Sequence, residues 1–148
     1  MELISSIYKL YEDIGKEILL GVPDKLKVIS EKHFDGQTGS FTVTLEILVL
    51  NRINDSDYGI VFSTNAQKNS HFGLNGAHFT EGLYLITDLS FGDGEIIDGT
   101  EELNYFPFSN ESNMQIWSIV ESFTISKIDS IKTILFTKYN ISSSQGAL

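Results

Sequence analysis

Residues 3–20, LISSIYKLYEDIGKEILL, hold apolar side chains at intervals of three and four positions. That spacing aligns them on one side of an α-helix, so the stretch predicts an amphipathic helix. Gly21 and Pro23 follow directly. They end the helical pattern, because glycine makes a flexible terminus and proline has no amide hydrogen to donate.

Beyond this helix the chain has the composition of short β-strands separated by turns. Residues 40–50, SFTVTLEILVL, are rich in β-branched and apolar side chains, as strands are. Three further strands are predicted at 25–34, 58–64 and 82–91. The intervening turn residues include Asp35, Gly36, Gly39, the segment 51–57 and the glycine-rich segment 92–99, which is predicted to be a loop. We expect these strands to form an antiparallel meander.

The last part of the chain predicts helices. Residues 109–123, SNESNMQIWSIVESF, offer several N-cap residues and an early Glu111 that suits the helix dipole. Residues 125–139 are ambiguous, since Ile128 and Ile131 suit a helix whereas ILFTKY alone suits a strand; we favour a helix. The predicted fold is therefore one α+β domain over residues 1–148, with an N-terminal helix, an antiparallel β-meander of about four or five strands and C-terminal helices packed on the sheet. The tail from about residue 141 is expected to be mobile.

The composition and the length of the apolar runs exclude several classes of function. The chain has no cysteine, which excludes a disulfide framework, a thiolate metal site and a cysteine nucleophile. The first twenty residues lack the basic start and continuous apolar stretch of a signal peptide. No run approaches the roughly 18 apolar residues that cross a bilayer. We therefore expect a cytoplasmic protein with no membrane partner.

The net charge of −10 is unevenly distributed along the chain. Residues 69–126 contain nine acids and no lysine or arginine, whereas the remainder holds eleven acids and ten bases. Nucleic-acid binding requires clustered basic side chains, so we expect no direct contact with nucleic acid here. A basic protein is the expected partner.

The sequence contains no recognisable motif for catalysis, metal binding or cofactor binding. We therefore expect no catalytic residues, no bound metal and no cofactor. His71 and His78 are too far apart for a helical zinc pair, although a loop could bring them together. The acidic loop DLSFGDGEIIDGTEE lacks the ligand spacing of a calcium loop, and the segment HFGLNGAHF lacks the lysine of a phosphate-binding loop. One alternative remains, a small hydrolase or ligand-binding module that uses the carboxylates of this acidic loop.

A helix that ends in a Gly-x-Pro turn, IYKLYEDIGKEILLGVPD (residues 7–24), followed by a strand meander and late helices in an acidic chain, resembles immunity proteins of bacterial polymorphic-toxin and contact-dependent growth inhibition systems. In sequence the resemblance covers about the first third of the chain. It implies a protein that binds a cognate toxin domain, commonly a nuclease, and blocks its active site. An adaptor or chaperone-like protein that uses an exposed strand edge is the other binding alternative.

A nuclease must be basic to hold its substrate, so carboxylates are the side chains expected to meet it. Pro107 makes the aromatic residues beside it candidates for an exposed anchor. The partner-binding residues predicted on these grounds are Glu81, Asp88, Asp93, Glu95, Asp98, Glu101, Glu102, Tyr105, Phe106 and Glu111.

Overall fold

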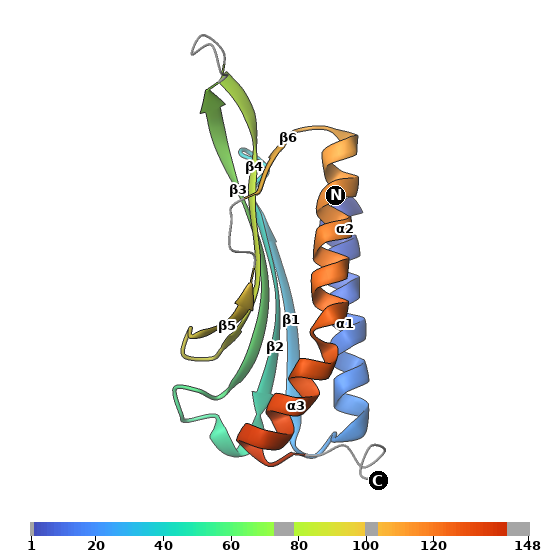
Figure 1. Ribbon diagram of the computed structural model, residues 1–148, viewed down its shortest axis with the longest axis vertical. Helices are drawn as coiled ribbons and strands as arrows, with labels where there is room; N and C mark the ends of the chain where they lie inside the picture. Colours follow the sequence, from blue (N-terminus) through green and yellow to red (C-terminus); the bar gives the residue numbers. More distant parts are fainter. Residues whose placement is uncertain (1, 73–78, 100–103, 142–148) are drawn as a thin grey trace.

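The computed structural model describes residues 2–72, 79–99 and 104–141, which form three helices packed on one face of a sheet (Figure 1). The predicted α+β fold, with its N-terminal helix, antiparallel sheet and C-terminal helices, is confirmed. In chain order the elements are α1 (Glu2–Gly21), β1 (Leu26–Phe34), β2 (Phe41–Val49), the 3₁₀ turn η1 (Leu50–Arg52), β3 (Gly59–Phe72), β4 (Phe79–Phe91), β5 (Ile96–Gly99), β6 (Asn104–Pro107), α2 (Asn110–Ser126) and α3 (Ile128–Tyr139).

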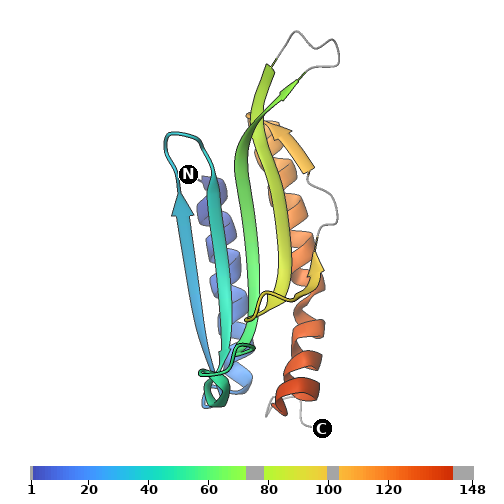
Figure 2. The ribbon, with the colours of Figure 1, turned by 90° about the vertical axis from the view of Figure 1, so that its left-hand side faces the viewer.

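The sheet is antiparallel throughout and contains six strands. Its order is β1-β2-β3-β4-β5, and β6 pairs with the other half of β4. Figure 2 shows this arrangement from the face that carries no helix, with β1 along one edge and the two short strands along the other. We call this uncovered side the outer face and the opposite side the helix-covered face.

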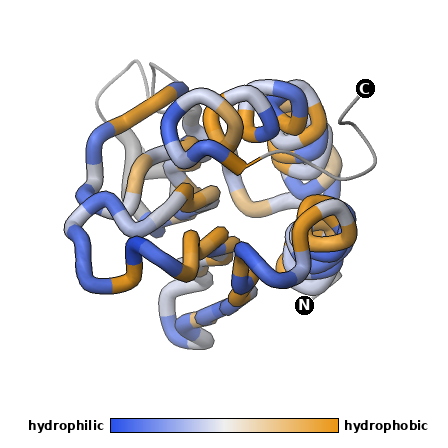
Figure 3. The backbone as a smooth tube through the Cα atoms, turned by 90° about the horizontal axis from the view of Figure 1, so that it is seen from below, coloured by the Kyte–Doolittle hydropathy of each residue, from blue (hydrophilic) through white to orange (hydrophobic). Residues whose placement is uncertain are grey.

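Alternation along β2 explains why one face of the sheet is buried. Phe41, Val43, Leu45, Ile47 and Val49 are buried, and the residues between them are only partly buried. Because successive side chains of a strand point to opposite faces, all five lie on the helix-covered face. Seen along the long axis, apolar and polar positions alternate on the strands beside the helix layer (Figure 3).

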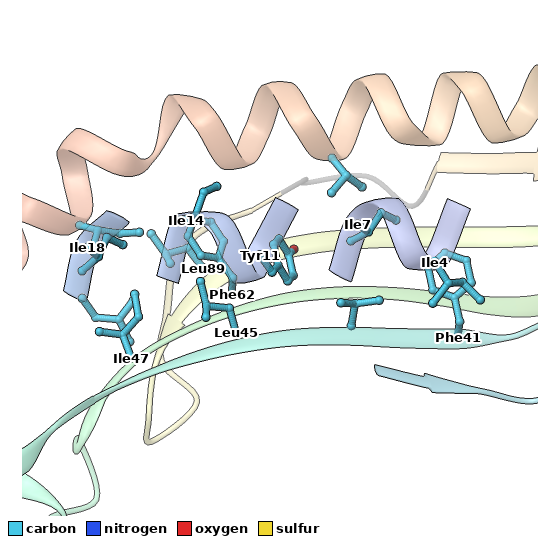
Figure 4. Close-up of a cluster of buried hydrophobic side chains, with 14 of the residues drawn as sticks. Ile4, Ile7, Tyr11, Ile14, Ile18, Phe41, Leu45, Ile47, Phe62 and Leu89 are labelled. Atoms are coloured by element: carbon cyan, nitrogen blue, oxygen red, sulfur yellow. The ribbon is translucent and has the colours of Figure 1, made fainter. Parts of the chain in front are cut away.

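Helix α1 supplies the other half of this core. Its buried residues recur at intervals of three and four, and Figure 4 shows those from Ile4 to Ile18 in one buried cluster with strand residues such as Phe41 and Leu45. The side chains are Leu3, Ile4, Ile7, Tyr11, Ile14 and Ile18. Gly15 allows close approach, since a Cβ atom there would lie 3.0 Å from Leu45 Cδ1 and 3.5 Å from Val28. Helix α1 therefore lies over β1 and β2.

A hydrogen-bonded chain of hydroxyl groups runs through the core. The Tyr11 hydroxyl lies 2.6 Å from Thr64 Oγ1, which lies 3.1 Å from Thr87 Oγ1. All three residues are fully buried. Burial raises the pKa of Tyr11 above its usual value, so the phenol stays protonated and available for hydrogen bonding. The network connects α1 to two central strands.

The C-terminal helices begin and end at recognisable caps. The Ser109 side chain accepts a hydrogen bond from the Ser112 amide at the start of α2. Lys127 separates α2 from α3, and Asn140 ends α3 in a left-handed conformation with φ of 56°. Residues 128–139 are helical, as favoured above. Their buried side chains recur every four residues, at Ile131, Leu135 and Tyr139.

Two strand predictions need correction. The segment 92–99 was predicted to be a loop, yet its second half is β5, which pairs with β4 across a register shift. The third and fourth strands are longer than the predicted 58–64 and 82–91, because a polar hairpin extends their pairing as far as Phe72 opposite Phe79. Antiparallel pairing satisfies the backbone groups of this hairpin whatever its side chains are. Residues 73–78, within the segment HFGLNGAHF, and the tail at 142–148 lie outside the described residues.

None of the helices in the described ranges has the length and apolar content needed to span a membrane.

Candidate functional site

The turn between β4 and β5 presents two of the predicted carboxylates to solvent. Asp93 Oδ1 accepts a hydrogen bond of 2.9 Å from the Glu95 amide, and Gly94 adopts a left-handed conformation with φ of 93°. The Phe91 amide closes the hairpin by donating to the Glu95 carbonyl at 2.9 Å. Asp93 and Glu95 are both exposed. The turn therefore holds two negative charges on a defined backbone.

Asp88 and Asp98 flank this turn but belong to opposite faces of the sheet. Asp88 pairs with Ser63 on the outer face, whereas Asp98 pairs with Leu89, whose side chain is buried on the helix-covered face. Partial burial raises the pKa of the Asp88 carboxyl. The Asp98 carboxylate accepts a hydrogen bond from the Lys127 ammonium, which lowers the pKa of Asp98. The two carboxylates cannot act together as an acid and base pair.

Folding brings basic residues beside the base-free stretch of sequence. Lys127 forms an ion pair with Asp98. Lys138 Nζ lies 3.6 Å from the centre of the Phe91 ring and 3.3 Å from Asp57 Oδ2. Nearby, the Tyr139 hydroxyl donates to the Asp57 carbonyl at 3.0 Å, and burial together with the charge of Asp57 raises the pKa of Tyr139 to about 12. The negative potential at this end of the sheet is therefore partly neutralised.

Of the other acidic residues in the prediction, only Glu111 has a described side chain. Glu111 is exposed in the first turn of α2, which begins near the top of Figure 1, whereas β5 lies in the lower half. Glu81 is in β4 with its side chain outside the described set, and Glu101 and Glu102 lie outside the described residues altogether. The predicted contacts whose side chains are described therefore do not form one compact patch.

The two aromatic candidates are on β6, a strand rather than a loop. Tyr105 packs against Tyr84 on the outer face, with ring centres 5.1 Å apart. Phe106 is only 8% exposed and pairs with Leu83 on the helix-covered face. Alternation along β6 buries Phe106, so the expectation that it is an exposed anchor is wrong. Phe108, which was not chosen, is 49% exposed.

A shallow groove between α1 and α2 was not predicted from the sequence. It has a volume of about 630 Å³ and is lined by Leu3, Ser6, Asn110, Asn113, Met114, Trp117 and Ser118. Met114 is 72% exposed, and Trp117 is only partly buried. The sequence did contain one signal for this groove. Met114 and Trp117 are three residues apart, which places two large apolar side chains on one face of the helix.

Metal-binding groups do not converge within the described residues, where no cluster of three or more histidine or acidic side chains occurs. His33 is exposed on β1. His71 is in β3 with an undescribed side chain, and His78 lies outside the described ranges.

Comparisons of the chain with protein-family models, with curated proteins and with solved structures gave no match.

Proposed function

We propose that this chain is an immunity protein, which binds a basic toxin domain and blocks its active site. The observation that carries the proposal is the stretch of 69–126 without lysine or arginine, because it supplies β4, β5, β6 and α2. We call strands β4, β5 and β6 with the β4–β5 turn the acidic edge. The Asp and Glu side chains of this stretch are not balanced by any lysine or arginine within it. They would therefore attract a nuclease or another enzyme with a cationic active site.

Within the acidic edge, the β4–β5 turn is the part best suited to contact. Asp93 and Glu95 are exposed, and neither forms an ion pair within the described residues. Their charges are therefore available to a partner, whereas Asp98 is engaged with Lys127. Exposed charges of this kind act mainly on the rate of association, since they steer the approach of an oppositely charged surface.

The first experiment is co-purification with the product of the neighbouring gene, followed by a test of whether this chain protects cells from that product. Failure to form a complex or to protect would refute the proposal. If a complex forms, the turn can be tested with the double substitution Asp93→Lys/Glu95→Lys. We expect its association rate constant at low ionic strength to fall about tenfold.

A matched control is Glu17→Lys/Asp24→Lys, which reverses two exposed acids outside the acidic edge. Each pair of substitutions adds four charge units and changes the net charge from −10 to −6. If both double variants slow association equally, net charge alone is responsible and the β4–β5 turn is not the contact. If only the Asp93/Glu95 variant associates more slowly, and added salt reduces the difference from wild type, the result supports the β4–β5 turn as the contact.

A further inference from the structure

Strand β1 forms an open edge of the sheet. In the described ranges its pairing partner is β2 alone, through an uninterrupted register from Leu26 opposite Val49 to Phe34 opposite Phe41. Figure 2 shows no other element beside it. The second side of an edge strand presents backbone amide and carbonyl groups in the spacing that another strand requires. A nine-residue edge without a bulge is long enough for a stable ladder.

The outer face of β1 carries two opposite charges around an apolar centre. Lys27, Ile29 and Glu31 alternate with residues of the helix-covered face, as their partners Leu48, Glu46 and Thr44 on β2 do. Lys27 and Glu31 are exposed, and within the described residues neither belongs to an ion pair. Both charges are therefore free to pair across the edge.

We propose that β1 pairs antiparallel with β1 of a second copy around a two-fold axis at Ile29, which joins the two sheets into one. This pairing places Lys27 opposite Glu31 of the second copy, and by symmetry the same ion pair forms again on the other side of the axis. Val28 then lies opposite Ser30. Opposite charges directly across antiparallel strands are stabilising, and like charges are destabilising.

Within β1 (Leu26–Phe34), neighbouring registers lack this complementarity. An axis at Ser30 places Ile29 opposite Glu31, and an axis at Val28 places Lys27 opposite Ile29. An axis at Glu31 brings the two Glu31 carboxylates together. If one strand slips by a single residue relative to the other, outer-face side chains come to lie opposite side chains of the helix-covered face. A continuous sheet does not allow this. The charge pattern therefore selects the Ile29 axis.

The helix layer is compatible with this arrangement. Because α1 lies over β1 and β2 and strands are about 4.8 Å apart, the axes of the two α1 helices would be roughly 10 Å apart. Packed helices are separated by about 8–10 Å. Tyr8 lies on the β1 side of its helix, where its ring is 4.6 Å from Lys32 Nζ. Leu19, about three turns later, shares that side and would approach Tyr8 of the other copy.

Charge substitutions test this register without disturbing the core, since both residues are exposed. Sedimentation equilibrium of the wild-type chain should give twice the monomer mass of 16.5 kDa. Lys27→Glu and Glu31→Lys should each raise the dimer dissociation constant by at least about tenfold, because each creates two like-charge pairs. The double variant Lys27→Glu/Glu31→Lys restores opposite charges and should dimerise like the wild type.

Mixing the two single variants gives the sharpest result. Their β1 strands are complementary to each other and not to themselves, so a heterodimer should form. Lys132→Glu, at an exposed lysine on α3, lowers the net charge by two units as Lys27→Glu does and should leave the dimer intact. A wild-type chain that stays monomeric, or a dimer that neither single variant weakens, would overturn the proposal. The test concerns β1 alone, so its result does not depend on toxin binding.

Discussion

The two edges of the sheet are built in different ways. On one side β1 is a single strand of nine residues that carries both signs of charge. On the other, β4 is covered by β5 and β6, which have four residues each. A long regular edge offers a ladder to another strand, whereas short strands offer little. Under the two proposals above, backbone groups would dominate recognition at β1 and carboxylates would dominate it at the acidic edge.

The largest effect that separates the two edges is expected from Phe106→Ala. Phe106 is the buried anchor of β6, and loss of a buried phenylalanine side chain costs about 3 kcal/mol or more. We expect the free energy of unfolding, measured in urea, to fall by about 3 kcal/mol. Phe108→Ala removes the same side chain from a half-exposed position and should cost less than about 1 kcal/mol. Equal losses would show that β6 is not held by Phe106.

A smaller loss is expected from Gly82→Ala. A Cβ atom at Gly82 would lie 2.3 Å from the Phe106 carbonyl oxygen and 2.8 Å from the Tyr105 ring, so β6 must move away from β4. Overpacking of this kind costs about 1–3 kcal/mol. The matched change at the other edge, Gly36→Ala in the β1–β2 turn, meets nothing closer than a Phe34 ring atom at 3.8 Å. Thermal unfolding should therefore distinguish the variants, and similar melting temperatures would contradict the close approach of β6.

The smallest effect concerns the ion pair between Asp98 and Lys127. The pKa of Asp98 is lowered in the folded chain, so its contribution to stability is present above the unfolded value of 3.8 and is lost as pH falls through the folded value. Asp98→Asn should cost less than about 1 kcal/mol at neutral pH, because the pair is partly solvated. The difference from wild type should vanish in acid. Melting curves recorded across pH measure this difference, and a loss that persists in acid would contradict a stabilising role of the ion pair.

The sequence was most informative where one face of an element is buried. The apolar spacing over residues 3–20 predicted α1 to within one residue at each end, and the apolar run at 40–50 predicted β2 equally closely. It was least informative where pairing is independent of side chains. The residues of β3 beyond Thr64 are mainly polar and β5 is flanked by glycines, so both segments have the composition of loops although their backbones pair with β4.

The candidate site could be predicted as a charge distribution but not as a surface. Counting residues identified the stretch without bases. It could not reveal that Lys127 meets Asp98, that Lys138 packs over Phe91, or that Asp88 and Asp98 point to opposite faces. Those relations depend on how α3 crosses the sheet and on the register of β5, neither of which leaves a local pattern. Phe106 was misplaced for the same reason, since its burial follows from the pairing of β6.

The hydroxyl network of the core has a consequence for the order of events during synthesis. Tyr11 is made early, but its partner Thr64 is 53 residues later and Thr87 a further 23. At roughly 5–20 residues per second, the nascent N-terminal segment waits several seconds for the groups that complete its polar contacts. Its apolar stripe has no sheet to cover it during that interval. Docking of the helix through Tyr11 therefore marks the point at which β3 and β4 have come together.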